Sequence, residues 1–136
     1  MRIDLSSFEN VLLSLQESCE VFQKDISNCF IRDSVIHRFG YTYELAHKML
    51  KRFLFASEFN GQNVKEMFFA DVIRLALSKG LLSQELENWY EYRNKRNATS
   101  HAYDEKKANE IVNMMPDFIS ETQYLLKKMK ERLENL

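Results

Sequence analysis

Glycine and proline are scarce in this chain, and the shortage limits the folds that it can adopt. Its 136 residues include three glycines and one proline, where average usage would give roughly ten glycines and seven prolines. Tight turns depend on these two residue types, so an all-β sandwich or barrel would lack the turn residues it needs. The same shortage excludes a collagen-like chain and a Pro/Gly-rich disordered chain. A mainly helical fold is therefore expected.

Apolar residues recur at intervals of three and four along three segments, residues 5–26, 36–53 and 112–133. This spacing places them on one face of a helix and leaves polar residues on the other faces. Residues 64–78 and 83–99 also have a helical composition, with a less regular apolar face. Long helices joined by short connections pack as antiparallel neighbours. We therefore expect residues 1–136 to form one domain, an all-α, up-and-down antiparallel bundle of four to five helices.

Several positions hold the residue types that begin, stop or bend helices. Asp33 or Ser34 is expected to cap the N-terminus of the second helix. The chain is expected to break at residues 60–61, Asn-Gly, before the third helix, and Gly80 is expected to end that helix. Pro116 lies inside the last apolar pattern, which continues beyond it. A kink in the last helix is therefore predicted at this proline.

Charge and cysteine content exclude several classes of protein. The net charge is −1, so any binding to nucleic acid must come from a local patch. The longest apolar runs are four residues, too short to span a membrane. Cys19 and Cys29 fit no zinc-binding spacing, and two thiols suit a reducing compartment, although one disulfide stays open. We expect a cytoplasmic protein that does not enter the membrane.

Motifs for metals and cofactors are nearly absent from the sequence. The three glycines lie far apart, so no glycine loop for phosphate binding is present. Glu44 and His47 form one Glu-x-x-His pair, but a di-iron bundle needs a second copy and two further carboxylates. We expect this pair to be a polar pair at the surface or at the edge of the core, and His37 to be structural. Neither a metal nor a cofactor is expected.

The segment of residues 90–107 differs from the rest of the chain in its chemistry. It contains five Lys/Arg against three Asp/Glu, and the cations gather before the histidine, as Arg93, Lys95 and Arg96. Aromatic residues interleave with these cations, as is typical of surfaces that bind nucleic acids or nucleotides. A solvated helix end followed by a polar turn would have the same composition, so composition alone leaves both interpretations open.

The spacing of Arg96 and His101 adds a structural condition. In an unbroken helix, residues five positions apart lie about 140° apart around the axis, so these two side chains would not share a face. They can approach one phosphate only if the helix unwinds between them, near residues 98–100. Thr99 and Ser100 are poor helix-interior residues and good turn formers, which favours such a departure.

The residues Arg96-Asn97-x-x-x-His101-x-Tyr103 resemble the Arg-x4-His-x-Tyr motif of the HEPN superfamily. The resemblance is to the members that are encoded beside minimal nucleotidyltransferases and are known as nucleotidyltransferase substrate-binding proteins. Arg-x4-His alone is a short pattern. Its position before the last long helix makes the resemblance specific.

Two further patterns extend this resemblance to nearly the whole chain. Residues 39–51, Phe-Gly-Tyr-Thr-Tyr-Glu-Leu-Ala-x-Lys-x-Leu-Lys, are similar to the second helix of the family. Residues 71–76, Asp-Val-Ile-Arg-x-Ala, followed by Gly80, are similar to its third. The length and the number of helices also agree. Relatives often carry an aromatic residue where this chain has His47, and this departure concerns packing rather than the motif.

The resemblance implies a four- or five-helix bundle that forms a homodimer, with the motif residues lining a cleft between the protomers. It implies the HEPN subunit of a two-component, toxin–antitoxin-like system. Such a subunit is a metal-independent ribonuclease toxin that a separate minimal nucleotidyltransferase neutralises, in some systems by adding AMP to the motif tyrosine. The alternative is a non-catalytic subunit that binds a nucleotide or substrate for that nucleotidyltransferase. A plain interaction module is a third interpretation, and the sequence does not separate active enzyme from binding subunit.

The resemblance assigns roles to residues of the motif, and their chemistry is consistent with those roles. His101 would act as general base or acid, because an imidazole exchanges protons near neutral pH. Arg96 would hold the phosphate and stabilise the charge of the transition state. Asn97 and Arg93 would support substrate binding. Tyr103 would either stack on RNA or carry the modification.

Overall fold

The computed structural model describes residues 2–57 and 62–135, and within these ranges it is helical without strands. The predicted break at residues 60–61 lies outside the described residues. The all-α prediction is confirmed. The elements in chain order are α1 (Ser6–Gln23), α2 (Cys29–Ser57), α3 (Gln62–Glu66), α4 (Phe69–Ser78), α5 (Leu86–Asn97), the short 3-10 helix η1 (Ala98–His101), α6 (Glu105–Asn113) and α7 (Met115–Glu134).

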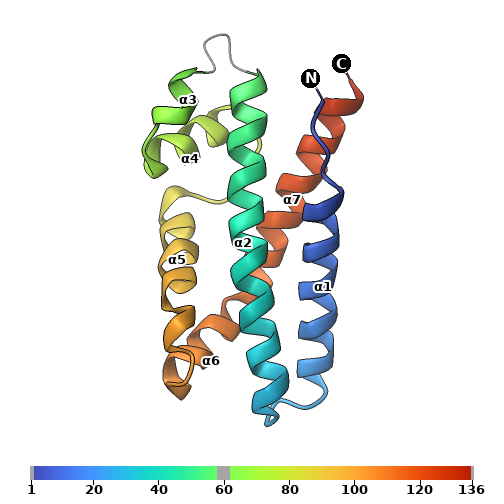
Figure 1. The fold of residues 1–136 in the computed structure, drawn as a ribbon, viewed down its shortest axis with the longest axis vertical. Coiled ribbons are helices and arrows are strands. Elements are labelled where there is room, and N and C mark those ends of the chain that lie inside the picture. The colour runs from blue at the N-terminus through green and yellow to red at the C-terminus, as the bar shows by residue number, and fades with distance from the viewer. Residues whose placement is uncertain (1, 58–61, 136) are drawn as a thin grey trace.

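The helices form an up-and-down bundle around α2 (Figure 1). In the figure α2 stands between α1 and α7 on one side and α3, α4 and α5 on the other. α1 and α2 run in opposite directions, and α5 runs down the bundle before α6 and α7 return to the end that holds both termini. This arrangement places the connection between α5 and α6, which carries the motif, beside the first half of α2.

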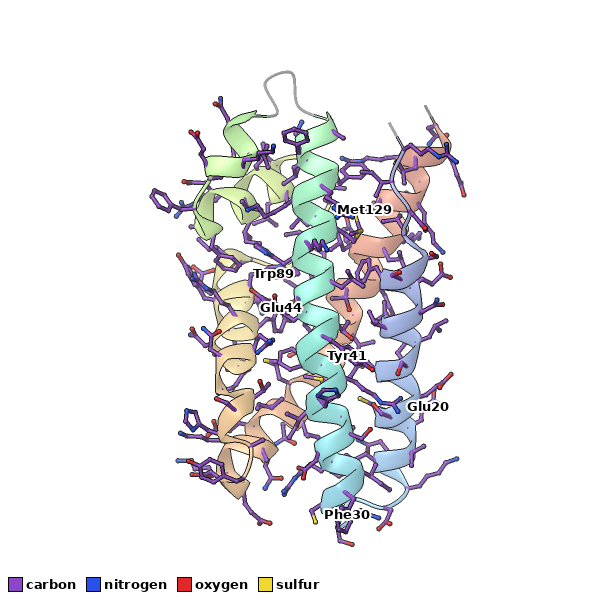
Figure 2. The ribbon with its side chains drawn as sticks, in the orientation of Figure 1. Glu20, Phe30, Tyr41, Glu44, Trp89 and Met129 are labelled. Atoms are coloured by element: carbon purple, nitrogen blue, oxygen red, sulfur yellow. The ribbon has the colours of Figure 1, made fainter. Side chains whose placement is uncertain are left out.

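The core consists of the apolar faces that the sequence pattern predicts for α1 and α2. In α2 the whole predicted stripe is buried, from Ile36 through Phe39 and Leu50 to Phe53. In the first segment the stripe is buried only as far as Phe22, because α1 ends at Gln23 and leaves Ile26 70% exposed. The largest fully buried side chains are aromatic or aliphatic, and Trp89 is the largest of them. Figure 2 labels Trp89 and another buried residue, Met129.

The last predicted helix changes direction where the sequence indicates, but the change is more than a kink. α6 ends at Asn113 and α7 begins at Met115, so the helix is interrupted for one residue, and Pro116 lies in the first turn of α7. A proline is accommodated there because the first helical N–H groups have no intrahelical partner. The predicted stripe is buried in part: Met115, Thr122 and Met129 are buried, whereas Val112 and Ile119 are half-buried and the preceding residues Ile111 and Phe118 are buried in their place.

Two other helix boundaries differ from the sequence-based expectation. α2 begins at Cys29, because the Asn28 side-chain oxygen accepts the backbone N–H groups of Phe30 and Ile31 at 3.0 and 3.2 Å. The prediction of Asp33 or Ser34 as the cap was therefore wrong. Residues 64–78 form two helices, α3 and α4, instead of one. A continuous helix would place Phe68 on the buried face of Val64, and the break leaves Phe68 81% exposed.

A buried carboxylate sets where α5 begins. Glu121 of α7 is fully buried. Its two oxygens accept the backbone N–H groups of Ser83 and Gln84 at 3.0 and 2.9 Å, and Trp89 Nε1 donates to it at 2.9 Å. These bonds hold residues 83–84 outside the helix, so α5 begins at Leu86 and not at residue 83. The glycine stop before this connection is confirmed, because Gly80 has φ of +74°.

The structure bears on the predictions about membrane spans and cysteines. Within the described residues, no helix has the length and apolar content needed to cross a membrane. Cys19 and Cys29 are free thiols. Partial burial raises the pKa of the Cys19 thiol to about 11, and this half-buried side chain packs against the core as a small apolar residue.

Candidate functional site

The motif lies on a tight turn between α5 and α6. The α-helix gives way at Ala98 to the 3-10 helix η1, so the predicted departure from regular helix is present at residues 98–100. Thr99 stabilises this change because its hydroxyl donates to the Arg96 carbonyl at 2.9 Å. The chain then turns again, and Asp104 caps α6 by accepting the backbone N–H groups at its first turn. Side-chain hydrogen bonds therefore replace the glycines that such turns commonly use.

Arg96 is held against the middle of α2. Its Nε donates to the Gly40 carbonyl at 3.2 Å and lies 3.3 Å from Glu44 Oε1, and its Nη1 donates to the Thr99 hydroxyl at 3.4 Å. A Cβ at Gly40 would lie 3.6 Å from Arg96 Cδ and Nε. Because Gly40 has no side chain, the guanidinium lies over bare helix backbone, which we call the open strip of α2. The side chain of Arg96 is 34% exposed and that of Glu44 is 62% exposed.

A hollow of about 460 Å³ opens in front of Arg96. The motif turn contributes Arg96, Thr99 and Ser100, and α2 contributes a row of residues that includes Gly40 and Glu44. His37 and Tyr41 also line the hollow, with their rings edge to face at 5.4 Å. The sequence analysis predicted that His37 is structural. In the structure His37 is exposed and lines the same hollow as Arg96.

His101 and Tyr103 lie on the outer side of the same turn. His101 is exposed, and Tyr103 is 83% exposed. Their rings meet edge to face at 6.0 Å, with Tyr103 Oη 3.5 Å from His101 Nδ1. Neither residue lines the hollow of Arg96. The structure therefore brings His101 together with Tyr103, and the approach of His101 and Arg96 to one phosphate stays a prediction.

The two residues predicted to support substrate binding, one in the motif and one just before it, also face solvent. Asn97 and Arg93 are exposed on α5. The Arg93 guanidinium lies 4.8 Å from the centre of the Phe69 ring, so it is turned toward α4. A cation over a ring in this position keeps its charge accessible while its stem is held in place. Arg93 is thus one helical turn from Arg96, outside the hollow.

The electrostatics of the site favour an exchange of anions on Arg96. Its partner Glu44 is mostly exposed, and ion pairs of this kind contribute little net stability because water competes for both charges. A guanidinium also binds phosphate through two parallel N–H donors. A phosphate group entering the hollow can therefore displace Glu44 at a small cost in free energy.

The residues of the Glu-x-x-His pattern have separate roles. Glu44 pairs with Arg96, whereas His47 lies between the rings of Tyr43 and Phe69, at centroid distances of 6.2 and 5.6 Å. His47 Nε2 is buried without a hydrogen-bond partner. Burial, aided by the nearby Lys51, lowers the pKa of His47. Among the described residues, no three of the side chains that bind metals are grouped closely enough to hold an ion.

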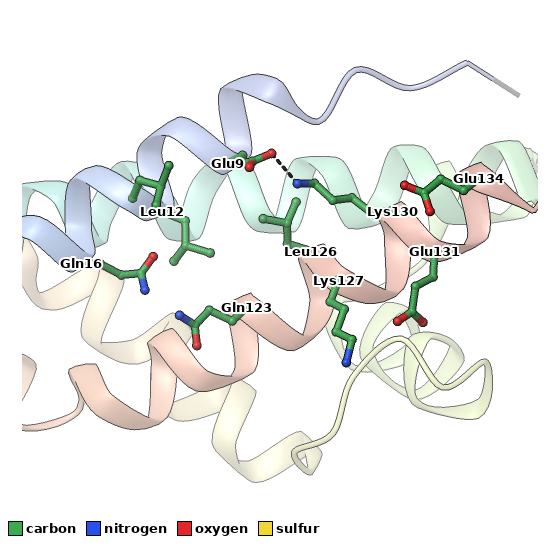
Figure 3. A pocket seen from close by; sticks show the side chains of 10 residues that line it. Glu9, Leu12, Gln16, Gln123, Leu126, Lys127, Lys130, Glu131 and Glu134 are labelled. Carbon is green, nitrogen blue, oxygen red and sulfur yellow. Dashed lines mark ion pairs between the residues drawn. The ribbon is translucent and has the colours of Figure 1, made fainter.

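A second hollow, of about 390 Å³, lies between α1 and α7 (Figure 3). Leu12 and Leu126 form part of its wall, and Glu9 and Lys130 pair across it at 2.6 Å. The residues that line it belong to α1 and α7 and include none of the motif. Three glutamates and two lysines line this hollow, so it is slightly acidic and less suited to a phosphate, and we place the candidate site at Arg96.

The bundle and the Arg-x4-His-x-Tyr turn define the class of protein, a HEPN-type subunit of a two-component nucleotidyltransferase system. The chain matches the family model for proteins like the nucleotidyltransferase substrate binding protein over residues 3–131, and it belongs to that family. The probable ribonuclease HepT of Haemophilus influenzae is 34% identical to it over 112 residues, which cover 79% of this chain and 76% of that protein.

A solved structure shows the same fold. This Haemophilus influenzae protein was reported to reveal the fold of a substrate binding domain of a nucleotidyltransferase. It matches with a TM-score of 0.87 and 29% sequence identity, over 93% of this chain and 99% of the other. The family resemblance stated from the motif is therefore confirmed.

Sequence reasoning missed the contribution of α2 to the site. Gly40 and Tyr41 line the hollow, and Glu44 pairs with Arg96. One available signal was Gly40 itself, because a glycine in the middle of a long helix lowers helix stability by roughly 0.5–1 kcal/mol relative to alanine. Such a residue marks a place where something approaches the backbone closely, and here the guanidinium of Arg96 does so.

Proposed function

We propose that this chain is a metal-independent ribonuclease toxin, the HEPN subunit whose partner is a separate minimal nucleotidyltransferase. The observation that carries the proposal is the position of Arg96. It is held over the open strip of α2 at Gly40, with only an exposed carboxylate as its anion, on the turn that also carries His101. The likeness to the probable ribonuclease HepT supports the same activity.

RNA supplies its own nucleophile for this reaction. The ribose 2′-oxygen bonds to the adjacent phosphorus, and the bond from phosphorus to the 5′-oxygen of the next nucleotide breaks. A base takes the proton of the 2′-OH, and an acid returns a proton to the leaving 5′-oxygen, which are steps that an imidazole performs near neutral pH. His101 exchanges these protons, and Arg96 stabilises the charge of the pentacoordinate phosphate. The products end in a 2′,3′-cyclic phosphate and a 5′-hydroxyl.

The site is completed by a second copy of the chain in this proposal. His101 and Arg96 face different sides of their turn within one protomer. A homodimer that faces two motif turns toward each other would set His101 of one protomer beside Arg96 of the other. Asn97 and Arg93, exposed on α5, would bind the phosphates on either side.

Tyr103 is the point of control. Its side chain is 83% exposed, so its hydroxyl is accessible both to RNA and to another enzyme. In the modification, the tyrosine oxygen bonds to the α-phosphorus of ATP and pyrophosphate leaves, which adds AMP to the ring. The bulky anion next to His101 would repel RNA phosphates and stop cleavage. We place the pair of proteins in the cytoplasm.

Cleavage of RNA in excess EDTA tests the activity. We expect the chain to cleave, and Arg96→Ala and His101→Ala to lose about a hundredfold or more of the rate while remaining folded by circular dichroism. Arg74→Ala, which removes an exposed arginine of α4, is the matched control and should retain the wild-type rate. Undiminished cleavage by the Arg96→Ala/His101→Ala double variant would disprove the proposal.

A second function, a non-catalytic subunit that binds a nucleotide or substrate, is favoured by the hollow itself. Arg96 would hold a phosphate there, and His37 and Tyr41 would contact a base. Co-expression with the nucleotidyltransferase, followed by intact-mass measurement, separates the two functions. A mass gain in AMP units that Tyr103→Phe abolishes supports the regulated toxin. An unmodified chain in a stable complex, without RNA cleavage, supports the binding subunit.

A further inference from the structure

Three hollows follow one another along the outward face of α2. The hollow in front of Arg96 shares Tyr41 and Glu44 with a middle hollow of about 710 Å³. The middle hollow shares Lys51 and Arg52 with an end hollow of about 260 Å³. We call this row of three adjacent hollows the α2 furrow. From Gly40 to Phe55 it extends about 22 Å at the rise of an α-helix, and Figure 1 shows α2 between the two flanking groups of helices.

The charge of the α2 furrow is strongly one-sided. Lys48, Lys51 and Arg52 line the middle hollow of about 710 Å³. Lys51, Arg52 and Lys65 line the end hollow of about 260 Å³. Among the described residues, carboxylates line only the end near Arg96, where Glu44 pairs with it. In a chain whose net charge is −1, this is the local basic patch that binding to a polyanion requires.

Three cations of the furrow also lack an ion pair among the residues that the structure describes. Lys48, Lys51 and Arg52 make no ion pair with any residue that the structure describes. Lys95 on α5, by contrast, has two carboxylates within 3.4 Å, and Lys130 on α7 has one at 2.6 Å. The positive field reaches the ring of His47 as well, since Lys51 contributes to the lowering of its pKa. Cations left without partners along one groove are suited to the phosphates of a ligand.

Aromatic side chains accompany the cations. Tyr41 and Phe55 are each 37% exposed. Tyr41 lines both the hollow in front of Arg96 and the middle hollow, and Phe55 lines the end hollow. Lys65 Nζ lies 4.9 Å from the centre of the Phe55 ring. Exposed rings contact the faces of unpaired bases, which are inaccessible in a duplex because neighbouring bases cover them. This combination favours a single nucleic-acid strand over an acidic protein surface, which needs no ring faces.

We propose that the α2 furrow binds a single strand of RNA, with its phosphates on Lys48, Lys51 and Arg52, and leads that strand to Arg96. The inference rests on the proposed function for the choice of RNA over DNA, because only RNA carries the 2′-OH that the cleavage uses. It adds the class of substrate, unpaired RNA, and the direction from which the strand enters the site.

The test is a binding measurement that does not depend on cleavage. The probe is a fluorescent, single-stranded 2′-O-methyl oligouridine about 12 nucleotides long, which lacks the nucleophile and stays intact. The variant is Lys48→Ala/Lys51→Ala/Arg52→Ala in the full chain, and alanine maintains the helix. We expect it to weaken binding about tenfold or more and to reduce the slope of log K against log salt by about 2.

The matched control removes the same charge elsewhere. Lys24, Arg74 and Lys127 are exposed cations outside the furrow. Their triple alanine variant should bind the probe within about twofold of wild type. An oligouridine annealed to its complement should bind more weakly than the single strand, since its bases cannot reach Tyr41 and Phe55.

The outcomes separate this inference from the proposed function. Loss of probe binding in the furrow variant, with no cleavage of natural RNA by wild type, supports the furrow and contradicts the ribonuclease. Cleavage by wild type with an unchanged affinity and salt slope in the furrow variant overturns the furrow. It is equally overturned if wild type does not bind the probe. It also fails if the variant binds RNA normally but loses the nucleotidyltransferase or a second copy of the chain, because the furrow would then be a protein interface.

Discussion

Two charged side chains, Glu121 and Arg96, each reach from one helix to the backbone of another segment, and their environments differ sharply. Glu121 is fully buried, and its oxygens accept bonds from two backbone N–H groups, a hydroxyl and the indole of Trp89. Arg96 is partly exposed and contacts one carbonyl, one hydroxyl and one exposed carboxylate. The first group has no capacity left for a ligand, and the second has donors facing a hollow.

The difference teaches how this bundle separates stability from function. A buried charge is stable only when its hydrogen-bonding capacity is filled, and removing it leaves its partners without acceptors. A half-exposed charge with a weak partner contributes little to folding and can exchange that partner for a substrate phosphate. Glu121 therefore fixes where α5 begins. Arg96 lies near the other end of α5, so its place against α2 depends on the position of that helix.

The largest expected effect is on stability at Glu121. Glu121→Ala removes the acceptor of the Ser83 and Gln84 N–H groups and of the buried indole N–H of Trp89, and it should lower the free energy of unfolding by about 3 kcal/mol. Urea denaturation measures it, and Glu20→Ala, at an exposed position of α1, is the control with an expected change near zero. A loss in Glu121→Ala no larger than that of Glu20→Ala would contradict the structural role of Glu121.

Arg96 is expected to show the reverse pattern. Arg96→Ala should change the free energy of unfolding by less than about 1 kcal/mol, because its ion pair is exposed. The rate of RNA cleavage should fall about a hundredfold or more. Arg96→Lys retains the charge but not the planar pair of donors, so it should recover only part of the rate. If Arg96→Ala destabilised the chain as much as Glu121→Ala, the contrast between the two regions would not hold.

Gly40 and Gly80, the two glycines that the structure describes, provide a smaller and opposite pair of effects. At Gly40 a Cβ fits in ordinary contact with the stem of Arg96, so Gly40→Ala should raise stability by about 0.5–1 kcal/mol. At Gly80 the backbone has φ of +74°, so Gly80→Ala should lower stability by about 1 kcal/mol. Thermal denaturation of both variants checks the signs. Equal signs would show that Gly40 does not lie on an open strip of helix.

The smallest effect concerns the half-buried His47, whose Nε2 is buried without a hydrogen-bond partner. Burial lowers its pKa in the folded state below the unfolded value of about 6.5. Because the unfolded chain then binds more protons, His47 reduces stability as the pH falls below about 6.5. Urea denaturation between about pH 7.5 and about pH 5.5 should show a shallower loss in His47→Phe than in wild type. An identical loss in both would contradict the assignment.

The sequence predicted the parts of the molecule that depend on local pattern. The buried stripe of α2 follows from its regular spacing, and the turn after Arg96 follows from Thr99 and Ser100 at a point where two motif residues needed a departure from helix. The glycine stop at Gly80 follows from backbone geometry alone. Each of these predictions uses information within a few residues of the position concerned.

The sequence did not predict the features that depend on contacts between distant segments. Glu121 looks like a surface residue of an amphipathic helix until residues 83–84 are brought to it. The break at Met67 and Phe68 depends on how α3 and α4 pack, and the role of Gly40 depends on Arg96 lying 56 residues away along the chain. The place of His37 in the site was missed because Arg96 and Thr99, which line the same hollow, come from a distant segment of the chain.

The chemistry of the RNA ends tests the central claim, that Arg96 and His101 carry out metal-independent cleavage, most directly. RNA is incubated with the wild-type chain in excess EDTA, and the fragments are analysed by mass spectrometry. The account predicts 2′,3′-cyclic phosphate and 5′-hydroxyl ends, formed by wild type and by Arg74→Ala but not by Arg96→Ala or His101→Ala. Fragments with 5′-phosphate ends, or the same cyclic ends formed undiminished by the Arg96→Ala and His101→Ala variants, would contradict it.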